Sequence, residues 1–477
     1  MHVHFVAIAG TGMGSLAGLL KSRGWRVTGS DRSVYPPMST ALARWGIPVQ
    51  EGFAASHVLE PRPDLVVIGN AVRPDNPEAR AALQAGLPVL SFPDALYEHA
   101  IRGRHSVVVA GTHGKTTTTS MIATLLHEVG RDPSMLVGGI AANFDASFRE
   151  GAGPEFVVEG DEYDTAFFDK TPKFLHYHPE TLVLTSVEFD HADIYRDLDH
   201  VKQQFIELVS RMPAGGRIVA AAGDATVDEV LEHAASPVVR YSVEMPLARG
   251  GYLAHDLHVG TDGTRFRVRG PDGKEAPARL RMVGRHNVAN ALAALGVLDG
   301  RGVPLSEAAR ALGAYRGVKR RQEERGTAAG VLVIDDFAHH PTAVRETLQA
   351  LAARHAGRRI VALFEPRSNT SRRALFQEAY AQAFDAAHHV VVARVAEGPL
   401  YSATGEVGER LSADRLVSDL EARGLSAVAC DDVEGILRHL RGELVAGDVV
   451  VTLSNGGFGG IWERLLDQLR GRETEPA

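Results

Sequence analysis

The sequence lacks the features of several protein classes. Its single cysteine, Cys430, cannot form a disulfide within the chain, which favours a reducing compartment, and we expect a cytoplasmic protein. No apolar stretch approaches the roughly 18 residues of a membrane-spanning helix. The N-terminus MHVHFVAIAG lacks the basic start and cleavage site of a signal peptide. Basic residues do not predominate, since the net charge is −8, so neither nucleic acid nor a membrane surface is expected as a partner.

The remaining composition is that of an ordinary globular protein. Hydrophobic residues make up 44% of the chain and charged residues 23%, which excludes a disordered, collagen-like or fibrous protein. A length of 477 residues predicts about three domains and more than one hydrophobic core.

Short apolar strands alternate with amphipathic helices along most of the chain. This pattern predicts an α/β protein of three domains, each built on a mostly parallel sheet with helices on both faces. We place the domains at residues 1–103, 104–321 and 322–477. Between Gly251 and Gly284 the pattern changes, because TRFRVR alternates strictly and two Asp-Gly dipeptides interrupt the strands. We therefore expect a small antiparallel meander in the central domain.

The most specific motif is AGTHGKTTTT at residues 110–119, which follows an apolar strand and opens a helix. Its glycines let the backbone wrap an anion, amides at the helix start point toward it, and Lys115 adds a mobile positive charge. Thr116 offers a hydroxyl to a Mg²⁺ ion between two phosphates. Val109 stands where the usual loop has its first glycine, so this is a shortened variant. The motif predicts a nucleotide-phosphate site.

A first glycine cluster, Gly10-Thr11-Gly12-Met13-Gly14, also follows a strand, and Asp31 ends the next strand. The spacing is close to that of a dinucleotide site, in which the acid holds a ribose hydroxyl, but Ser15 replaces the third glycine. A nicotinamide, a flavin or another pyrophosphate such as a nucleotide sugar would suit this turn. A tight turn without any ligand is the alternative.

Metal-binding residue types follow two strands of the middle unit. Glu159 ends the strand of EFVVEGDEYD, and His191 lies in EFDHAD after TLVLTSV. Carboxyl ends of parallel strands meet at one edge of a sheet, so both residues should face the crevice of Thr116. Oxygen ligands with one imidazole suit Mg²⁺ or Mn²⁺ on a triphosphate. The neighbouring acids are expected only to solvate loops: Asp161, Glu162, Asp164 and Asp193.

Further along the chain, GRHNVANALAAL places Asn287 and Asn290 on one face of a helix start. They would either read an adenine edge or cap the helix. The charged run VKRRQEERG precedes the third domain, where an arginine could reach back to phosphate or simply be solvated.

These motifs, together with DDFAHHPT at 335–342, resemble the Mur ligase superfamily, whose members build or rebuild the peptide of bacterial cell-wall precursors. The similarity spans essentially the whole chain. It implies a Rossmann-like N-terminal domain that binds UDP-N-acetylmuramate, a central P-loop ATPase domain, and a Rossmann-like C-terminal domain that binds an amine donor. The reaction is then an ATP-dependent amide ligation through an acyl phosphate, with Lys115 and His191 as catalytic residues.

The resemblance also implies binding roles residue by residue. ATP would contact Gly111, Thr112, His113, Gly114, Lys115, Thr116, Thr117, Asn287, Asn290, Arg321 and Asp336. The divalent metal would be held by Thr116, Glu159 and His191, and the UDP-sugar by Gly10, Thr11, Gly12, Met13 and Asp31. Two departures stand out: Gln322 follows Arg321 where the family has an apolar residue, so Arg320 is an alternative, and Ile206 occupies the place of a carbamylated lysine.

Within the family, EPRSNTS and SNGGFGGI resemble members that use the recycled wall tripeptide L-alanyl-γ-D-glutamyl-meso-diaminopimelate. The DD-x-x-HHPT element is shared with members that add L-alanine, which is the alternative donor. A donor with several carboxylates needs anion-binding groups, which loops after two C-terminal strands offer. We expect the peptide at Arg367, Ser368, Asn369, Asn455 and Gly456, whereas at least one of Arg372 and Arg373 should be a surface charge.

A different class remains open from the residues alone, namely a nucleotide-binding redox or regulatory protein that uses only Gly10–Gly14 and Asp31. Lys115 with Glu159 and His191 argues against it, because a dehydrogenase has no use for these groups.

Overall fold

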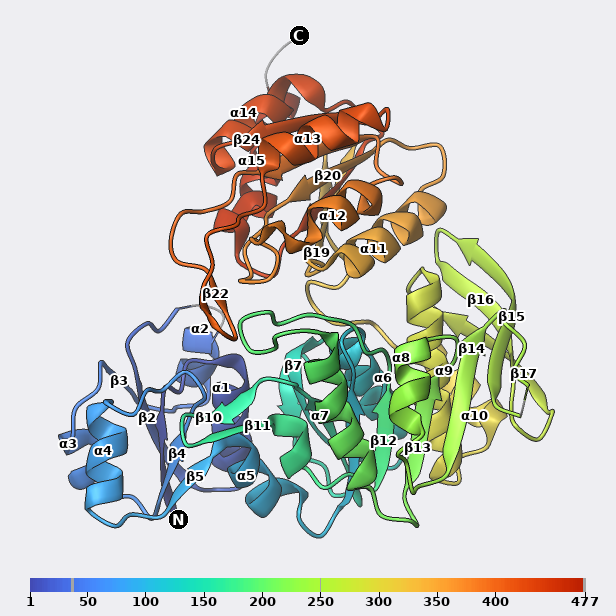
Figure 1. The fold of residues 1–477 in the computed structure, drawn as a ribbon. Helices are drawn as coiled ribbons and strands as arrows, with labels where there is room; N and C mark the ends of the chain where they lie inside the picture. The colour runs from blue at the N-terminus through green and yellow to red at the C-terminus, as the bar shows by residue number, and fades with distance from the viewer. Residues whose placement is uncertain (36–37, 249, 475–477) are drawn as a thin grey trace.

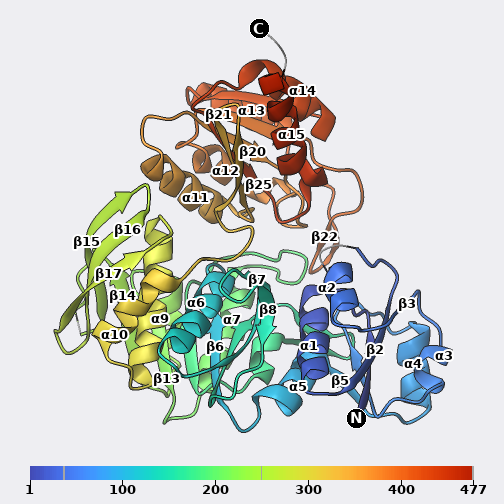
Figure 2. The same ribbon diagram turned by 180° about the vertical axis from the view of Figure 1, so that it is seen from behind.

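The computed structural model describes residues 1–35, 38–248 and 250–474 and contains three main β-sheets, one after another along the chain (Figures 1 and 2). Helices cover both faces of the sheets, so the predicted α/β class is confirmed. No helix within these ranges has the length and apolarity to cross a membrane.

The first sheet has five parallel strands in the order β3-β2-β1-β4-β5. Of its inner strands, β4 is wholly apolar and buried, and four of the five residues of β1 are buried, as expected of strands covered by helices on both faces. The strands are β1 (His2–Val6), β2 (Arg26–Asp31), β3 (Val49–Glu51), β4 (Leu65–Ile68) and β5 (Val89–Ser91). The helices are α1 (Thr11–Ser22), α2 (Met38–Arg44), α3 (Ser56–Leu59), α4 (Pro77–Gln84) and α5 (Phe92–Leu96), with a π-helical turn η1 (Tyr97–Ile101).

The central sheet has ten strands in the order β17-β16-β15-β14-β13-β12-β6-β9-β7-β8. They are β6 (His105–Ala110), β7 (Ser134–Ala141), β8 (Ala146–Arg149), β9 (Glu155–Gly160), β12 (Thr181–Leu184), β13 (Arg217–Ala221), β14 (Val238–Val243), β15 (Tyr252–Gly260), β16 (Gly263–Arg269) and β17 (Glu275–Leu280). Its helices are α6 (Lys115–Glu128), α7 (Leu198–Ser210), α8 (Ala225–Leu231), α9 (Arg285–Gly300) and α10 (Leu305–Ala311). A hairpin of β10 (Asp164–Ala166) and β11 (Asp169–Pro172) precedes the short 3₁₀ helix η2 (Lys173–His176), and another, η3 (Leu312–Ala314), follows α10.

The expected antiparallel meander is confirmed as β15–β17, but it is not a separate layer. Strand β15 pairs in parallel with β14, so the meander extends the central sheet at one edge. Gly263, at φ +120°, makes the turn into β16, where an added Cβ would overlap the backbone of Leu280.

The third sheet has six strands in the order β18-β19-β25-β20-β21-β24, and only β18 runs antiparallel to its neighbour. They are β18 (Glu323–Ala328), β19 (Val331–Asp336), β20 (Ile360–Phe364), β21 (His389–Ala393), β24 (Ser426–Cys430) and β25 (Val449–Leu453). The helices are α11 (Pro341–Arg354), η4 (Ala374–Phe376), α12 (Gln377–Ala383), α13 (Ala413–Ala422), α14 (Val433–Glu443), η5 (Phe458–Gly460) and α15 (Ile461–Thr474), and a small hairpin joins β22 (Tyr401–Ser402) to β23 (Gly405–Glu406).

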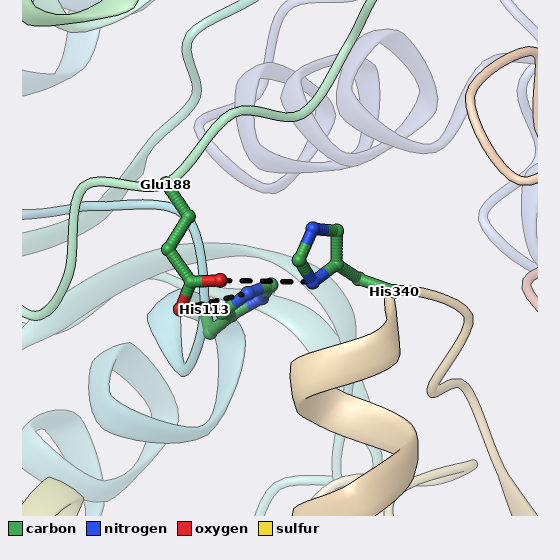
Figure 3. Close-up of side chains that lie close together, drawn as sticks. All are labelled: His113, Glu188 and His340. Carbon is green, nitrogen blue, oxygen red and sulfur yellow. Dashed lines mark ion pairs between the residues drawn. The ribbon is translucent and has the colours of Figure 1, made fainter. Parts of the chain in front are cut away.

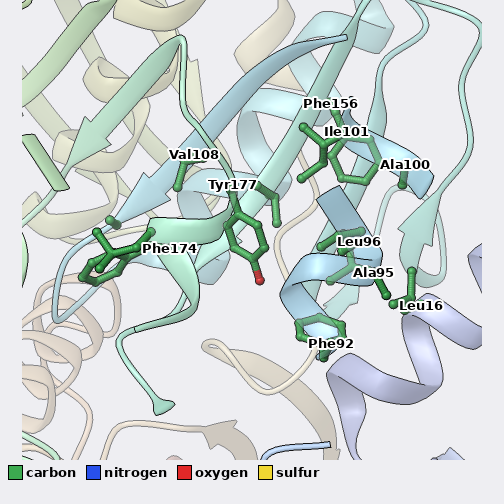
Figure 4. Close-up of a cluster of buried hydrophobic side chains, with 14 of the residues drawn as sticks. Leu16, Phe92, Ala95, Leu96, Ala100, Ile101, Val108, Phe156, Phe174 and Tyr177 are labelled. Carbon is green, nitrogen blue, oxygen red and sulfur yellow. The ribbon is translucent and has the colours of Figure 1, made fainter. Parts of the chain in front are cut away.

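The first two sheets share one hydrophobic core. Figure 4 shows Leu16 and Phe92 of the first sheet's helices beside Tyr177 and Phe156 of the central part. The third sheet has its own clusters, which draw only on residues 328–469. Shared apolar burial therefore holds the first two sheets together, whereas the third packs as a separate unit.

A substitution at Gly18 of α1 tests this shared core, because an added Cβ would overlap the side chains of Phe148 in β8 and of Trp45. We expect Gly18→Ala to lower the free energy of unfolding by about 1–3 kcal/mol through overpacking. The matched control is Gly442→Ala on α14, where a Cβ meets open space, and it should be neutral or stabilise by up to ~1 kcal/mol. Denaturant unfolding measures both, and equal effects would show that α1 and β8 do not pack tightly.

Candidate active site

One cavity of about 1650 Å³ is lined by residues from all three sheets. The carboxyl ends of parallel strands open onto it, where ligands gather in α/β folds. Gly12 lines it from α1, beside the first sheet, Lys115 from α6, beside the central sheet, and Asp336 from the end of β19 in the third sheet. Most of the expected site residues line this cavity, but Gly111, Asp31, Ser368 and Asn369 do not.

The loop between β6 and α6 depends on two glycines with positive φ. Gly111 has φ +131° and Gly114 φ +78°. Side chains at these positions would overlap Thr185 and Asn290, because the loop is pressed against β12 and α9. No side chain caps the start of α6. Its first amides thus remain available for an anion, as the motif predicts.

Glu162 links the two residues expected to be catalytic. Its carboxylate lies 2.8 Å from Lys115 Nζ and 2.9 Å from His191 Nε2, and only 3% of the residue is exposed. The expectation that Glu162 merely solvates a loop is therefore wrong. The acidic residues that follow β9 in the sequence indicate negative charge at this position, but the sequence does not show that the side chain of Glu162 is buried.

The buried charged groups around Glu162 shift one another's pKa values. Burial works against the charged form of His191, but Asp190 and Glu162 outweigh it and raise the pKa of this imidazole to about 9. Burial likewise opposes charge on Lys115, yet Glu162 and Asp161 raise the pKa of its ammonium group. Asp190, 6% exposed, is a second site residue that was not singled out from the sequence.

Glu159 and Thr116 meet at the base of the cavity. Thr116 Oγ1 donates to Glu159 Oε1 at 2.9 Å, and the Gly138 amide donates to Glu159 Oε2 at 2.7 Å. Burial raises the pKa of Glu159 despite nearby Lys115. A hydroxyl and a buried carboxylate form a donor set that suits a hard divalent cation, whose charge would favour the ionised carboxylate.

The asparagines predicted on one helix face lie at the start of α9, and both are buried. Asn287 Nδ2 donates to Val283 O at 2.8 Å, so part of its amide serves the helix start. Asn290 lies behind the loop, where its Oδ1 would meet a Cβ on Gly114. Both line the cavity beside that loop.

The two hinge arginines have different environments. Arg320 pairs with Asp335 at 3.0 Å and donates to Ser454 O at 2.9 Å, so it is bound to the third sheet. Arg321 is packed over the Phe337 ring, 4.7 Å from its centroid, and both arginines line the cavity, but the guanidinium of Arg320 is already paired. This favours Arg321 as the arginine that reaches a ligand.

The first glycine cluster opens α1 without a side-chain cap, and Gly10 to Met13 line the cavity. Asp31 binds the backbone of two turns, the glycine turn after β1 and its own turn after β2. Its Oδ2 accepts from the Ala9 amide at 2.9 Å and its Oδ1 from the Ser33 amide at 3.2 Å. Asp31 thus shapes the loop rather than the cavity wall.

The C-terminal loops supply Arg367, Asn455 and Gly456 to the cavity, and a Cβ on Gly456 would overlap the Arg367 side chain. Ser368 and Asn369 form hydrogen bonds within the third sheet's part of the chain instead. The Ser368 hydroxyl donates to Ser371 Oγ at 2.8 Å, while the Asn369 amide pairs with the backbone of Tyr401.

Three hydrogen bonds at Ala192 dock the third sheet onto the loop of His191. The Ala192 amide donates to Thr370 Oγ1 at 3.2 Å. The Ala192 carbonyl accepts from the Arg373 guanidinium at 3.1 Å and from the Ala403 amide in the β22–β23 hairpin at 3.2 Å. Figure 1 shows this hairpin extending from the C-terminal part toward the rest of the chain. Arg373 is therefore an interdomain contact.

Comparison with known protein families finds three matching family models along the chain. The chain matches the models "Mur ligase family, catalytic domain" over residues 2–104, "Mur ligase middle domain" over 109–298, and "Mur ligase, glutamate ligase domain" over 320–456.

Individual proteins match over nearly the whole chain. It is 40% identical over 470 residues to the Escherichia coli UDP-N-acetylmuramate–L-alanyl-γ-D-glutamyl-meso-2,6-diaminoheptandioate ligase, covering 98% of each chain. It is 34% identical to the UDP-N-acetylmuramate–L-alanine ligase of Syntrophobacter fumaroxidans, covering 98% of this chain and 96% of that one. The crystal structure of a Psychrobacter arcticus murein peptide ligase superposes with a TM-score of 0.73 at 36% identity, covering all of both chains.

The docking contact predicts a difference between two adjacent arginines. Arg373→Ala should speed amide exchange at Ala192 by roughly 5- to 30-fold, because it removes a hydrogen bond that holds the third sheet in place. Arg372→Ala is the control, since Arg372 donates to Ala396 and Gly398 within its own domain. Hydrogen exchange with mass spectrometry measures both, and identical protection in the two variants would contradict this docking role.

Proposed function

The chain belongs to the Mur ligase family, and from that premise we propose that it joins L-alanyl-γ-D-glutamyl-meso-diaminopimelate to UDP-N-acetylmuramate. It is an ATP-dependent ligase that forms a carbon–nitrogen bond. The substrate assignment is carried by one observation, the 40% full-length identity to a ligase named for this pair of substrates, against 34% to one named for L-alanine. The product would return a recovered wall peptide to peptidoglycan synthesis.

The domain roles follow the layout of the cavity. We assign the UDP-sugar to the turn at Gly10–Met13, ATP to the loop at Gly111–Thr117 with Asn287, Asn290, Arg321 and Asp336, and the amine donor to the third sheet. The two loops that carry Arg367 and Asn455 support the last assignment because both line the cavity. ATP and a UDP-linked sugar are cytoplasmic metabolites, so a cytoplasmic location is part of this proposal.

The chemistry required is activation of a carboxylate. A carboxylate does not react with an amine because hydroxide is a poor leaving group, whereas the acyl phosphate formed by γ-phosphoryl transfer loses phosphate readily. The difficulty is to bring two anions together. Lys115 and the first amides of α6 are suited to hold the transferring phosphoryl group, since both present positive charge at the loop.

Thr116, Glu159 and His191 would hold Mg²⁺, which when bound neutralises phosphate charge during the transfer. Glu162 positions Lys115 and His191 through its two ion pairs. In the protein alone His191 carries a proton at neutral pH, because its pKa is raised to about 9. That proton must leave before the imidazole can act as a ligand.

The third sheet closes the cavity over the reacting groups. Its docking on Ala192 lies directly beside His191, so the position of the donor domain is coupled to the loop that holds the metal. Such closure would keep water from the acyl phosphate.

Substitution of Lys115 tests its proposed role in phosphoryl transfer. Lys115→Ala should lower phosphate release from ATP, in the presence of UDP-N-acetylmuramate and tripeptide, by roughly 100-fold or more. The variant should also lose stability, because Glu162 would keep only His191 as its charged partner. The control is Lys170→Ala, whose exposed ammonium group pairs with Asp164 outside the cavity. Near-normal turnover of a folded Lys115→Ala protein would overturn the role.

The donor is tested by competition. Product should form at far lower concentrations of tripeptide than of L-alanine, because Arg367 can hold a donor carboxylate bidentately. Arg367→Ala should raise the KM for tripeptide by about tenfold or more with little change in the KM for ATP. The matched control is Arg394→Ala, which pairs with Asp414 and Asp431 at the surface. If L-alanine is the better donor, the tripeptide assignment fails while the ligase chemistry stands.

A further inference from the structure

Two histidines and a glutamate meet at one side of the cavity, apart from the residues assigned to Mg²⁺. His113 belongs to the nucleotide loop, Glu188 to the loop after β12, and His340 caps the start of α11 in the third sheet's domain. Figure 3 shows the Glu188 carboxylate between the two imidazoles. Within residues 1–35, 38–248 and 250–474, this is the one group of three such side chains whose ligand atoms all lie within 4.8 Å.

The separations are too long for hydrogen bonds but fit a shared ion. His113 Nε2 lies 3.6 Å from Glu188 Oε1, and His340 Nδ1 lies 3.8 Å from Glu188 Oε2. Ligand atoms that are each about 2.0–2.2 Å from a zinc ion lie roughly 3–4 Å from one another. Two of the three separations thus fit ligands around a common centre, and the third, between the two imidazoles, is within 4.8 Å.

The described residues provide few hydrogen bonds to the imidazole nitrogens. The Nε2 atoms of His113 and His340 are buried and have no hydrogen-bond partner among the described residues, and only 6% of His340 is exposed. His340 Nδ1, the nitrogen that faces Glu188, accepts one long bond, 3.3 Å, from the Thr342 amide, and it would give up this bond to an ion. Buried imidazoles normally satisfy their nitrogens, so this arrangement calls for an additional partner.

Neighbouring groups act on the side chains of the cluster. Burial and the nearby His113 lower the pKa of His340 to about 4. Burial opposes ionisation of Glu188, but its partners, chiefly His113 and Thr342, lower the pKa of the carboxyl to about 2. Thr342 Oγ1 also donates to Glu188 Oε2 at 2.8 Å, which orients the carboxylate as supporting groups do around metal ligands.

We propose that His113, Glu188 and His340 form a site for a transition-metal ion of the Zn²⁺ type, distinct from the Mg²⁺ site of the ligation reaction. Two imidazoles and one carboxylate are the donors of zinc sites, whereas Mg²⁺ prefers oxygen ligands. The ligands come from both sides of the domain boundary. A bound ion would fasten α11 to the nucleotide loop and bias the third sheet toward its docked position.

The test uses Co²⁺ as the probe, because its visible absorption reports a coordination sphere with few ligands. Metal-stripped protein is titrated with Co²⁺ in excess Mg²⁺ and without nucleotide, so that the oxygen-rich site does not contribute. Wild type should bind one equivalent with a visible band that Zn²⁺ abolishes. His340→Gln and Glu188→Gln should each weaken binding by about tenfold or more. The control is His355→Gln at the opposite end of α11.

Circular dichroism verifies that each variant is folded, and the two cluster variants provide independent tests if one fails to fold. An unchanged band in folded His340→Gln and Glu188→Gln would overturn the proposal. It would equally fail if wild type gave no band, or if excess Mg²⁺ displaced the Co²⁺. No substrate is needed, so the outcome is independent of the ligase assignment.

Discussion

The buried carboxylate of Glu162 is the constraint on which the site depends. It is almost inaccessible to water, so its charge must be balanced by protein groups, and Lys115 and His191 do so from two different loops. These two loops follow β6 and β12, which are adjacent strands. Removal of either partner would leave Glu162 with a single counter-charge, so the loops that carry Lys115 and His191 are held in one arrangement by the same residue.

The way the sheets are joined divides the molecule into a rigid part and a docked part. The first two sheets share an apolar core, which resists separation because exposing it to water is unfavourable. The third sheet has its own core and meets the rest through directional polar contacts such as those at Ala192. Polar contacts exchange readily with water, so this boundary can open and close. A ligase that admits two large substrates and then excludes water needs this combination.

Two kinds of cation-binding chemistry lie side by side in the cavity. Thr116 and Glu159 provide oxygen donors near the loop that we assign to ATP, and such donors suit a hard ion that travels with phosphate. His113, Glu188 and His340 provide two imidazoles across the domain boundary. The difference in donor type would let one cavity hold two different ions, and an ion at the second site would add a contact across the domain boundary.

Local sequence patterns determined the elements of this protein. Strand and helix alternation predicts the α/β class, strict alternation predicts the meander at β15–β17, and Gly111 and Gly114 before Lys115 predict the loop, because each depends on residues close together in the chain. Only the tertiary structure decided which partners the charged groups find: Glu162 turns inward, Asp31 binds the glycine turn after β1, and Arg373 reaches Ala192. These outcomes depend on partners distant in the sequence, and a carboxylate or guanidinium looks the same in a sequence whether water or a buried counter-charge surrounds it.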